Sequence, residues 1–251
     1  MKSIFITGAT GLLGKMFVKH FLANNYQVIY TSSSEEKIKE FNKEYSDYVD
    51  NGILYGCFVD LMDDDCIKKI RNYLKSNNLR VNYLINNARK LDNVLVNHWQ
   101  DIDSTKWHDE YHLDVVVPYQ LSVELSDLKY ELKGIVNIAS MYGFLPYNDY
   151  LCNGSEAIAI NYGICKAALI QLTKELAIRL SNKKIRVNAI SYGGVDGRAD
   201  DAFKRRYADL CPMKDMLNED DVVGHALYLC SEQSSGMTGQ NIVVDGGFSV
   251  W

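Results

Sequence analysis

Short apolar runs alternate with amphipathic stretches from one end of the chain to the other. The runs predict strands over Ile4–Thr7, Val28–Thr31, Ile53–Val59, Val81–Ile85, Gly134–Ala139, Ile185–Ile190 and Asn241–Val244. Between them, helical spacing of apolar residues predicts helices over Leu12–Asn24, Glu35–Tyr48, Asp64–Lys75, Lys106–Leu128, Ile158–Leu180 and Glu219–Leu229. The strand runs are apolar throughout, as in sheets that are covered on both faces. The alternation therefore predicts an α/β fold, a doubly wound parallel sheet of about seven strands with helices on both faces.

Composition limits the class of protein further. No linker or repeat divides the chain, so we expect a single domain over residues 1–251. The 27 Lys and Arg against 32 Asp and Glu give a formal net charge of −5, which argues against a nucleic-acid or anionic-membrane surface. No apolar run approaches the roughly 18–20 residues that cross a bilayer, and the N-terminus does not resemble a signal peptide. With six cysteines but no C-x-x-C pair, we expect a soluble cytoplasmic protein with free thiols.

Two stretches interrupt the alternation. Residues 141–157 are rich in aromatic and turn-forming residues, and residues 193–217 combine several glycines with a charged helical segment. In an open α/β sheet, ligands bind beyond the carboxyl ends of the strands, and both stretches leave such ends. We expect a substrate-side loop at 141–157 that sets substrate choice without holding the fold, and a flexible segment at 193–217.

The first predicted strand leads through a glycine-rich turn directly into a helix. Glycines in such a turn let the backbone approach a pyrophosphate closely, and the helix N-terminus favours its negative charge. The strand–turn–helix context predicts a dinucleotide site. Its residues are Thr7, Gly8, Thr10, Gly11, Leu12, Leu13 and Gly14.

The end of the second strand predicts which dinucleotide is bound. An Asp or Glu there binds the ribose 2′-hydroxyl of NAD and repels the 2′-phosphate of NADP. This chain has Ser32 and Ser33, with no carboxylate before Glu35, and Lys15 and Lys37 supply positive charge. The pattern favours NADP and leaves NAD open.

Two further strand ends supply candidate cofactor contacts. Asp60 and Leu61 follow the third strand, where they are placed to touch the adenine. Asn87 and Ala88 follow the fourth strand, where they are placed to lie under the cofactor.

Tyr162 and Lys166 stand four residues apart in a predicted helix, so their side chains face the same way. A nearby ammonium favours the phenolate form of a tyrosine, which makes Tyr162 a usable acid–base toward a hydroxyl or carbonyl. Ser140, at the end of the fifth strand, is placed to hydrogen-bond the same oxygen. Together with the glycine-rich turn, this set predicts a catalytic site.

In this order, the motifs resemble the short-chain dehydrogenase/reductase family, in its compact single-domain branch, over essentially the whole chain. They are TGATGLLG at 7–14, Asp60, NNA at 86–88, Ser140, YGICK at 162–166, IRVNAI at 185–190 and TGQNIVVDGG at 238–247. The resemblance implies a Rossmann-like sheet, a nicotinamide cofactor, and hydride transfer to or from a carbinol or carbonyl carbon. It also implies a homo-oligomer, a tetramer or dimer, in which the two long helices pair across a two-fold axis. The apolar C-terminus Phe248–Trp251, which would otherwise be exposed, fits that expectation.

The resemblance also implies a role for each candidate residue. Tyr162 is the acid–base, and Ser140 positions the substrate oxygen. Lys166 binds the nicotinamide ribose and favours the Tyr162 phenolate. Gly193 and Val195, after the sixth strand, join the cofactor contacts.

Several positions depart from the family pattern. The glycine spacing of the first turn resembles the longer, sugar-nucleotide branch of the family. Asp114 stands where the family has an asparagine whose main-chain carbonyl holds a proton-relay water; Asp114 can keep that water, but its charge would alter the relay. Arg89 replaces the glycine expected after NNA. No catalytic side chain is missing, so we expect an active enzyme with Asp114 in its catalytic set.

The interval between Ser140 and Tyr162 is long for the family, and its additional residues fall in the 141–157 loop. The loop is similar to those of relatives in bacterial surface-sugar and flagellin-glycosylation pathways. Its polar side chains suit a polyhydroxylated substrate, and an arginine suits an anionic one, such as a sugar phosphate or nucleotide sugar. The expected substrate contacts are Arg89, Tyr142, Tyr147, Asn148 and Asn153.

Two other interpretations stay open. One is a catalytically silent, NADP-binding regulator on the same fold, which the presence of Ser140, Tyr162 and Lys166 disfavours. The other is a sugar-nucleotide epimerase or dehydratase, favoured by the glycine spacing and disfavoured because such enzymes usually add a C-terminal substrate domain. His108 and His112 share a helix face, but no third ligand is evident and we predict no metal site.

Overall fold

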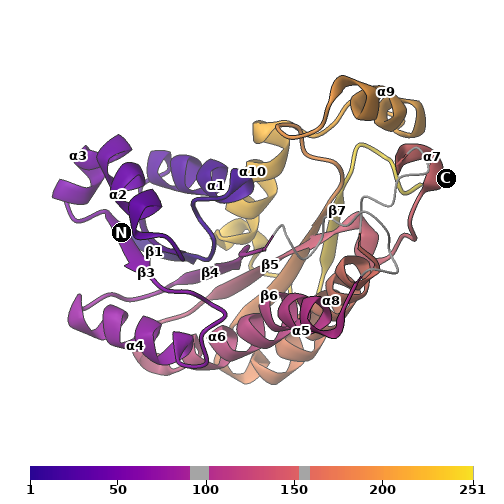
Figure 1. Ribbon diagram of the computed structural model, residues 1–251. Coiled ribbons are helices and arrows are strands. Elements are labelled where there is room, and N and C mark those ends of the chain that lie inside the picture. The colour runs from indigo at the N-terminus through magenta and orange to yellow at the C-terminus, as the bar shows by residue number, and fades with distance from the viewer. Residues whose placement is uncertain (91–101, 153–158, 251) are drawn as a thin grey trace.

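The computed structural model describes residues 1–90, 102–152 and 159–250. At its centre lies one sheet of seven strands in the order β3-β2-β1-β4-β5-β6-β7, with every neighbouring pair parallel (Figure 1). The predicted doubly wound α/β fold is confirmed. The strands are β1 (Lys2–Ile6), β2 (Tyr26–Ser32), β3 (Leu54–Phe58), β4 (Tyr83–Asn86), β5 (Gly134–Ser140), β6 (Arg186–Tyr192) and β7 (Asn241–Val244).

Helices cover both faces of the sheet (Figure 1). One face packs against α1, α2 and α10, and the other against α4, α6 and α8. None of the helices in the described residues is long and apolar enough to cross a membrane. The helices are α1 (Leu12–Ala23), α2 (Glu35–Glu44), α3 (Ser46–Asp50), α4 (Cys66–Ser76), α5 (Ser104–Tyr111), α6 (Val117–Leu125), α7 (Asp149–Cys152), α8 (Ile160–Arg179), α9 (Asp201–Leu210) and α10 (Glu219–Leu229).

The two faces explain why the strands are apolar at successive positions. Ile4 and Ile6 of β1 belong to the core cluster under α1, α2 and α10, whereas Phe5 belongs to the cluster under α4, α6 and α8. All three side chains are fully buried. Side chains alternate between the faces of a strand, so a sheet covered on both sides buries every position.

The strand order reverses between β1 and β4. From β1 the chain winds outward to β2 and β3, and then returns to β4 on the other side of β1. The carboxyl ends of these parallel strands share one edge of the sheet, and the helices that follow them diverge there. This reversal places the glycine-rich turn, the segment after β4 and the end of β5 next to one another.

The helix predicted over Lys106–Leu128 is two α-helices joined by a π-helical turn. α5 ends at Tyr111, the π-turn η3 spans His112–Val116, and α6 begins at Val117. Pro118 has no N–H to donate to the carbonyl of Asp114, four residues earlier, so an α-helical ladder cannot close at that point. Single π-turns of this kind recur at functional sites, and this one contains Asp114.

The helix predicted over Glu35–Tyr48 also divides. Tyr45 leaves helical geometry between α2 and α3. Its ring packs 4.9 Å from that of Phe41 and 6.4 Å from that of Tyr48, measured between centroids. These contacts fold α3 back beside α2.

A third, smaller core cluster lies at the carboxyl edge of the sheet and corrects two expectations. Met141 and Leu151 of the 141–157 loop are buried there with Tyr207 of α9. The loop therefore contributes to the core, contrary to the expectation that it does not hold the fold. Phe248 stacks on Tyr207 with 5.0 Å between ring centroids and is buried within its own chain, so it is not the exposed apolar residue that the sequence predicts.

The 141–157 loop and the 193–217 segment are also joined by polar contacts. The Tyr150 hydroxyl donates to Oδ2 of Asp209 at 2.6 Å, and Nε of Arg206 donates to the carbonyl of Leu151 at 2.8 Å. These bonds and the small cluster hold α7 beside α9 at the edge of the sheet (Figure 1). The flexibility of residues 193–217 stays a prediction.

Candidate active site

The glycine-rich turn between β1 and α1 is held by close backbone contacts. Gly8 has a φ of +65°, and a Cβ there would lie 2.7 Å from Cα of Ala88. A Cβ on Gly14 would lie 2.4 Å from the carbonyl oxygen of Gly8. These two glycines are therefore required by the packing of the turn on α1 and on the segment after β4.

Gly11 has a different role. A Cβ there would meet only the carbonyl oxygen of Gly8, at 3.3 Å, so packing does not demand glycine as strictly. Gly11 caps α1 without a side-chain hydrogen bond, and the first turn of α1 carries no acidic residue. The first N–H groups of α1, on Leu12, Leu13 and Gly14, are thus left for an anion, which fits the pyrophosphate of a dinucleotide.

Thr7 joins this turn to the segment after β4. Its hydroxyl accepts hydrogen bonds from the N–H groups of Asn87 at 2.9 Å and Ala88 at 3.0 Å. The Asn87 side-chain amide donates to the carbonyls of Thr7 at 2.9 Å and Gly8 at 3.2 Å. Thr7 and Asn87 therefore shape the floor of the candidate cofactor site, whether or not they also touch the cofactor.

The end of β2 offers hydroxyl groups to the adenosine ribose. Ser32 is almost buried, and its hydroxyl lies 3.1 Å from that of Thr10. Ser33 is exposed, as are Lys15 and Lys37. The end of β2 therefore has the hydroxyl residues Ser32 and Ser33 where an NAD site would have a carboxylate.

The remaining predicted cofactor contacts border the same edge. Asp60 is exposed and accepts a 2.9 Å hydrogen bond from the N–H of Met62, whereas Leu61 is buried. Gly193 and Val195 are half-buried after β6. Further along this segment, a Cβ on Gly197 would lie 3.1 Å from a methyl carbon of Leu12, so the segment passes beside the glycine-rich turn.

Ser140 and Tyr162 come from the end of β5 and the first turns of α8. Both side chains are almost buried. The Ser140 hydroxyl accepts a hydrogen bond of 3.2 Å from the N–H of Tyr142, so its proton stays available to another acceptor. The start of α8 is held in place by Asn161, whose amide donates to the carbonyl of Lys106 at 3.1 Å.

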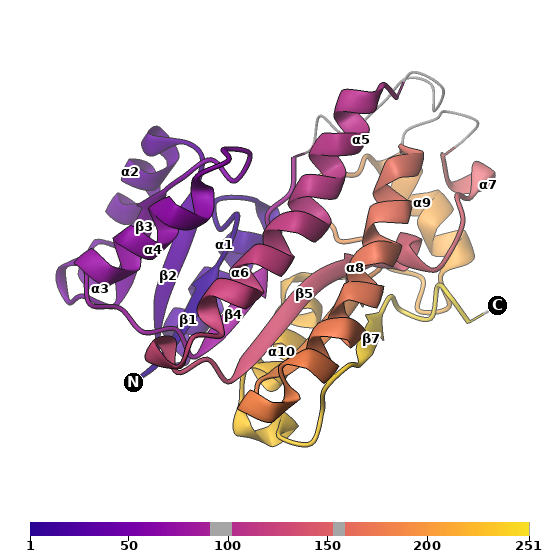
Figure 2. The same cartoon turned by 90° about the horizontal axis from the view of Figure 1, so that it is seen from below.

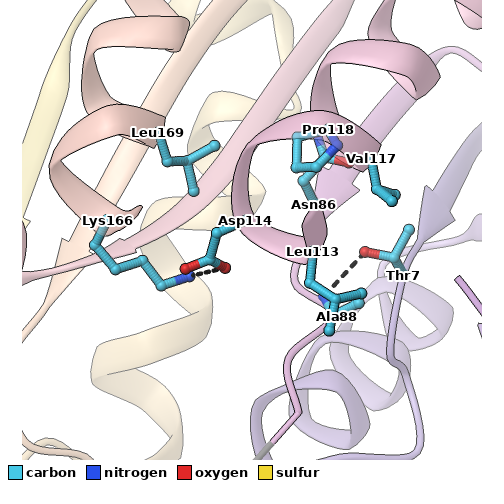
Figure 3. A pocket seen from close by; sticks show the side chains of 9 residues that line it. All are labelled: Thr7, Asn86, Ala88, Leu113, Asp114, Val117, Pro118, Lys166 and Leu169. Atoms are coloured by element: carbon cyan, nitrogen blue, oxygen red, sulfur yellow. Dashed lines mark hydrogen bonds and ion pairs between the residues drawn. The ribbon is translucent and has the colours of Figure 1, made fainter. Parts of the chain in front are cut away.

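Lys166 and Asp114 form a buried ion pair (Figure 3). Nζ of Lys166 donates to Oδ1 of Asp114 at 2.8 Å and to the carbonyl of Ile138 at 2.9 Å. Burial opposes the charged form of Lys166, but the Asp114 carboxylate outweighs it and raises the pKa of the ammonium. Burial raises the pKa of the Asp114 carboxyl, against the opposite pull of Lys166 and Arg89. Asp114 thus sets the position of the ammonium, whose Nζ lies 5.7 Å from the centroid of the Tyr162 ring.

A small cavity beside this pair is lined by Asp114, Asn86 and Thr7, among others, and has room for about one water molecule (Figure 3). Oδ1 of Asn86 and Oδ2 of Asp114 are buried acceptors with no partner among the described residues. Asn86 donates to Asn137 at 2.8 Å, and Asn137 donates to Thr173 at 2.9 Å, which orients the Asn86 oxygen. A water molecule in the cavity would donate to both acceptors.

Sequence reasoning did not identify Asn137 or Thr173. The only available signal was a polar residue inside the apolar run of β5 and a threonine on a helix face that otherwise carries leucines. Neither pattern says which partner lies across the core.

Arg89 contacts Tyr162. The central carbon of its guanidinium lies 4.7 Å from the centroid of the Tyr162 ring, a cation–π distance. Arg89 is exposed, and its neighbour Lys90 pairs with Asp109 of α5 at 3.2 Å. The predicted substrate residue therefore lies beside the predicted acid–base.

The structure distinguishes among the predicted loop contacts. Tyr147 is exposed, and the Tyr142 hydroxyl is buried. Oδ1 of Asn148 accepts a 3.0 Å hydrogen bond from the N–H of Leu151, so this amide oxygen orders α7. Asn153 lies outside the described residues.

Of the two histidines, His108 on α5 is exposed and His112 of the π-turn has a contact of its own. Nε2 of His112 lies 3.1 Å from the carbonyl of Leu61. Across residues 1–90, 102–152 and 159–250, no group of three or more His, Cys, Asp and Glu side chains could hold a metal ion.

Comparison with known proteins places this site in context. Residues 8–249 match the family model of enoyl-(acyl carrier protein) reductase. The chain is 31% identical to the 3-oxoacyl-acyl-carrier-protein reductase FabG of Buchnera aphidicola subsp. Acyrthosiphon pisum, over 98% of this chain and 96% of that protein. It is 24% identical to post-translational flagellin modification protein A of Campylobacter coli, over 99% and 98% of the two chains. A solved short-chain dehydrogenase from Leptospira borgpetersenii with bound NAD+ has 27% identity and a TM-score of 0.86, over 99% of this chain and 92% of that one.

Proposed function

The chain belongs to the short-chain dehydrogenase/reductase family, and on this premise we propose that it oxidises or reduces a sugar-derived substrate of bacterial surface glycan biosynthesis, in the cytoplasm. It is an NAD(P)-dependent oxidoreductase. The reacting group is a secondary alcohol or ketone of a sugar phosphate or nucleotide sugar. The observation that carries this substrate class is the exposed Arg89 guanidinium on the ring of Tyr162.

The nicotinamide cofactor, when bound, supplies or accepts the hydride. The residues of the site fit this cofactor. The N-terminus of α1 has no side-chain cap, and Gly11 has no side chain that would keep a pyrophosphate away from the backbone. Thr10, Ser32 and Ser33 would hold the adenosine ribose end, and Gly193 and Val195 would border the nicotinamide end.

In the proposed mechanism, Tyr162 donates a proton to the substrate oxygen or accepts one from it. In reduction, its hydroxyl gives a proton to the substrate oxygen, and in oxidation the phenolate takes that proton back. The Ser140 hydroxyl, whose proton is not used by its contact with Tyr142, donates a hydrogen bond to the same oxygen. A hydrogen bond aimed at an oxygen that gains negative charge stabilises the transition state more than the ground state.

Lys166 supplies positive charge near Tyr162, and Asp114 holds Lys166 in place. The cation favours the phenolate over the phenol because it offsets the negative charge of the phenolate. The cavity between Asp114 and Asn86 has room for about one water molecule, which would lie beside this pair.

The substrate class has one rival. Relatives named as 3-oxoacyl-acyl-carrier-protein reductases suggest an acyl thioester, whereas the relative named for flagellin modification suggests a surface glycan precursor. Arg89 and the exposed Tyr147 favour an anionic, hydroxylated substrate, because a guanidinium binds phosphate and a phenol hydrogen-bonds hydroxyls.

A substrate panel tests this proposal. Keto-sugar phosphates and keto nucleotide sugars should exceed their uncharged or deoxygenated analogues in kcat/KM by roughly 10²-fold or more, because a site built for polar groups rejects analogues that lack them. Turnover is followed by cofactor absorbance, with an acetoacetyl thioester as the rival substrate. A thioester turned over best would contradict the sugar proposal. An epimerised product without net cofactor oxidation would favour the epimerase interpretation.

The second prediction concerns Tyr162→Phe. General acid–base catalysis contributes about 10²–10⁴-fold, so kcat should fall by at least that factor while cofactor affinity stays unchanged. Stopped assays give kcat, and cofactor fluorescence gives affinity. Tyr228→Phe, at an exposed tyrosine of α10, is the matched control and should behave as wild type. Full turnover in Tyr162→Phe removes this tyrosine from the mechanism, and a wild type that binds cofactor without turning over any substrate supports the silent regulator.

The third prediction concerns the preference for NADP over NAD, which we propose from the serines after β2. Ser32→Asp should reverse the preference, because its carboxylate repels the 2′-phosphate. Ser32→Asn has nearly the same shape without the charge, and it should keep the preference for NADPH. Fluorescence titration with both reduced cofactors measures the ratio. A wild type that binds NADH more tightly shows that residues 31–34 were misinterpreted.

We also propose a homo-oligomer, a tetramer or dimer, built on α6 and α8. Tyr119 and Val123 on α6 and Ile160 and Ile164 on α8 are exposed apolar residues at helical spacing. The α5–α6 segment and α8 run side by side across one face (Figure 2). A second copy that covers this face would bury these side chains.

Light scattering, which measures the mass in solution, tests the proposed oligomer. The wild type should have at least twice the chain mass of 28.5 kDa. Ile164→Asp should reduce the mass, because a carboxylate in an apolar interface must be desolvated. Ala23→Asp, at an exposed position on α1, makes the same change in charge and is the control. A wild type at the mass of one chain would refute the oligomer.

A further inference from the structure

Arg89 and Asp114 are far apart in sequence, and both depart from the family pattern. Arg89 replaces a glycine and Asp114 replaces an asparagine, so each adds a charge that the family pattern lacks. The structure brings both charges to the same cluster: Arg89 lies on the Tyr162 ring, and Asp114 binds Lys166, which faces that ring. Arg89 also acts weakly on both members of the ion pair, since its charge opposes the net rise in the pKa of Asp114 and in that of Lys166.

Counting charges shows why the two changes belong together. In the family pattern, one lysine offsets the negative charge that Tyr162 acquires as a phenolate. With Asp114 2.8 Å from Lys166, that positive charge is largely cancelled, and a phenolate would add net negative charge to a buried site. Such a charge is costly in a low-dielectric interior. Arg89, with its guanidinium carbon 4.7 Å from the ring centroid, returns one positive charge to the cluster.

We propose that Arg89 and Asp114 are a compensating pair of positioning residues: Asp114 anchors the Lys166 ammonium, and Arg89 restores at Tyr162 the positive charge that Asp114 cancels. This inference rests on the proposed role of Tyr162 in catalysis. It adds to that role the reason why this chain tolerates a carboxylate at the base of its active site.

The other titratable groups near Tyr162 are the same in every comparison below. Within the described residues they include Lys166, beside the Tyr162 ring, Cys165 and Glu110, which interact with each other and with Lys166 or Asp114, and Tyr142, whose carbonyl lies next to Gly163. Burial raises the pKa of the Cys165 thiol to about 12, so this group stays neutral through the neutral pH range. The charges that differ are those of residues 89 and 114 alone.

Ionisation of Tyr162 can be measured without substrate or cofactor. The absorbance of each variant in the tyrosinate band is titrated with base and compared with that of the same variant carrying Tyr162→Phe, so that the difference belongs to one hydroxyl. The variants are Arg89→Gly, Arg89→Lys, Asp114→Asn, and Arg89→Gly with Asp114→Asn. The acidic limb of kcat/KM, measured on the same proteins, should move in the same direction.

The sign of each shift follows from the charge removed. Arg89→Gly should raise the midpoint of Tyr162 ionisation by about half a pH unit to one unit, because the phenolate loses a partly solvent-screened cation. Arg89→Lys keeps the charge and should stay close to wild type. Asp114→Asn should lower the midpoint by about one unit, because its carboxylate is buried. The double variant, which has the family pattern at both positions, should return to within about half a unit of wild type.

Two outcomes would overturn the inference. Equal shifts in Arg89→Gly and Arg89→Lys would mean that shape matters and charge does not. A double variant displaced as far as Asp114→Asn alone would mean that the two charges do not compensate. Thermal melting identifies a variant that does not fold, and the two substitutions at exposed Arg89 decide the sign even if Asp114→Asn is unstable. If Tyr162→Phe keeps full turnover, the proposed mechanism fails, and the base titration still tests the compensation.

Discussion

The contact between the glycine-rich turn and the segment after β4 is the constraint on which the site depends. At the reversal of strand order, Gly8 approaches Ala88 so closely that a Cβ would lie 2.7 Å from its Cα. The Thr7 hydroxyl joins the two segments by accepting from consecutive N–H groups. This contact sets the direction of α1 and hence the uncapped N–H groups that suit a pyrophosphate. Because Arg89 directly follows Ala88, this contact also fixes the backbone position from which the Arg89 side chain extends.

A second constraint is the buried Lys166–Asp114 pair. Taking two charges out of water is costly, and removal of one partner of such a pair typically destabilises a protein by about 3–5 kcal/mol. Compared with an apolar replacement of both residues, such a pair adds little net stability. Its contribution is to hold the ammonium in a defined position. The π-turn that carries Asp114 and the carbonyl of Ile138, which accepts from Lys166, orient the pair. The position of the ammonium beside Tyr162 follows from these contacts.

Two elements outside the main sheet are packed together at its carboxyl edge. The loop after β5 and the segment after β6 share a small apolar cluster of their own, and Tyr150 and Arg206 add polar contacts between them. This cluster lies at the carboxyl edge of the sheet, so it fixes the proposed substrate-side loop against α9. If the loop contacts the substrate as proposed, its stability and its specificity are coupled, because the same segment packs in the core.

The sequence alone determined the fold class and the residue types of the site, because both depend on local patterns. Apolar runs and helical spacing specify the strands and helices. Gly8 and Ser140 stand at strand ends, and Tyr162 and Lys166 stand one helical turn apart, so their proposed roles follow from residue type and local position. Only the tertiary structure decided that Asp114 binds Lys166, that Arg89 lies on Tyr162, and that Leu151 and Phe248 are buried. Each of these contacts joins residues from different elements. Their distance depends on how the sheet reverses and how the helices pack, which no local pattern of polar and apolar residues encodes.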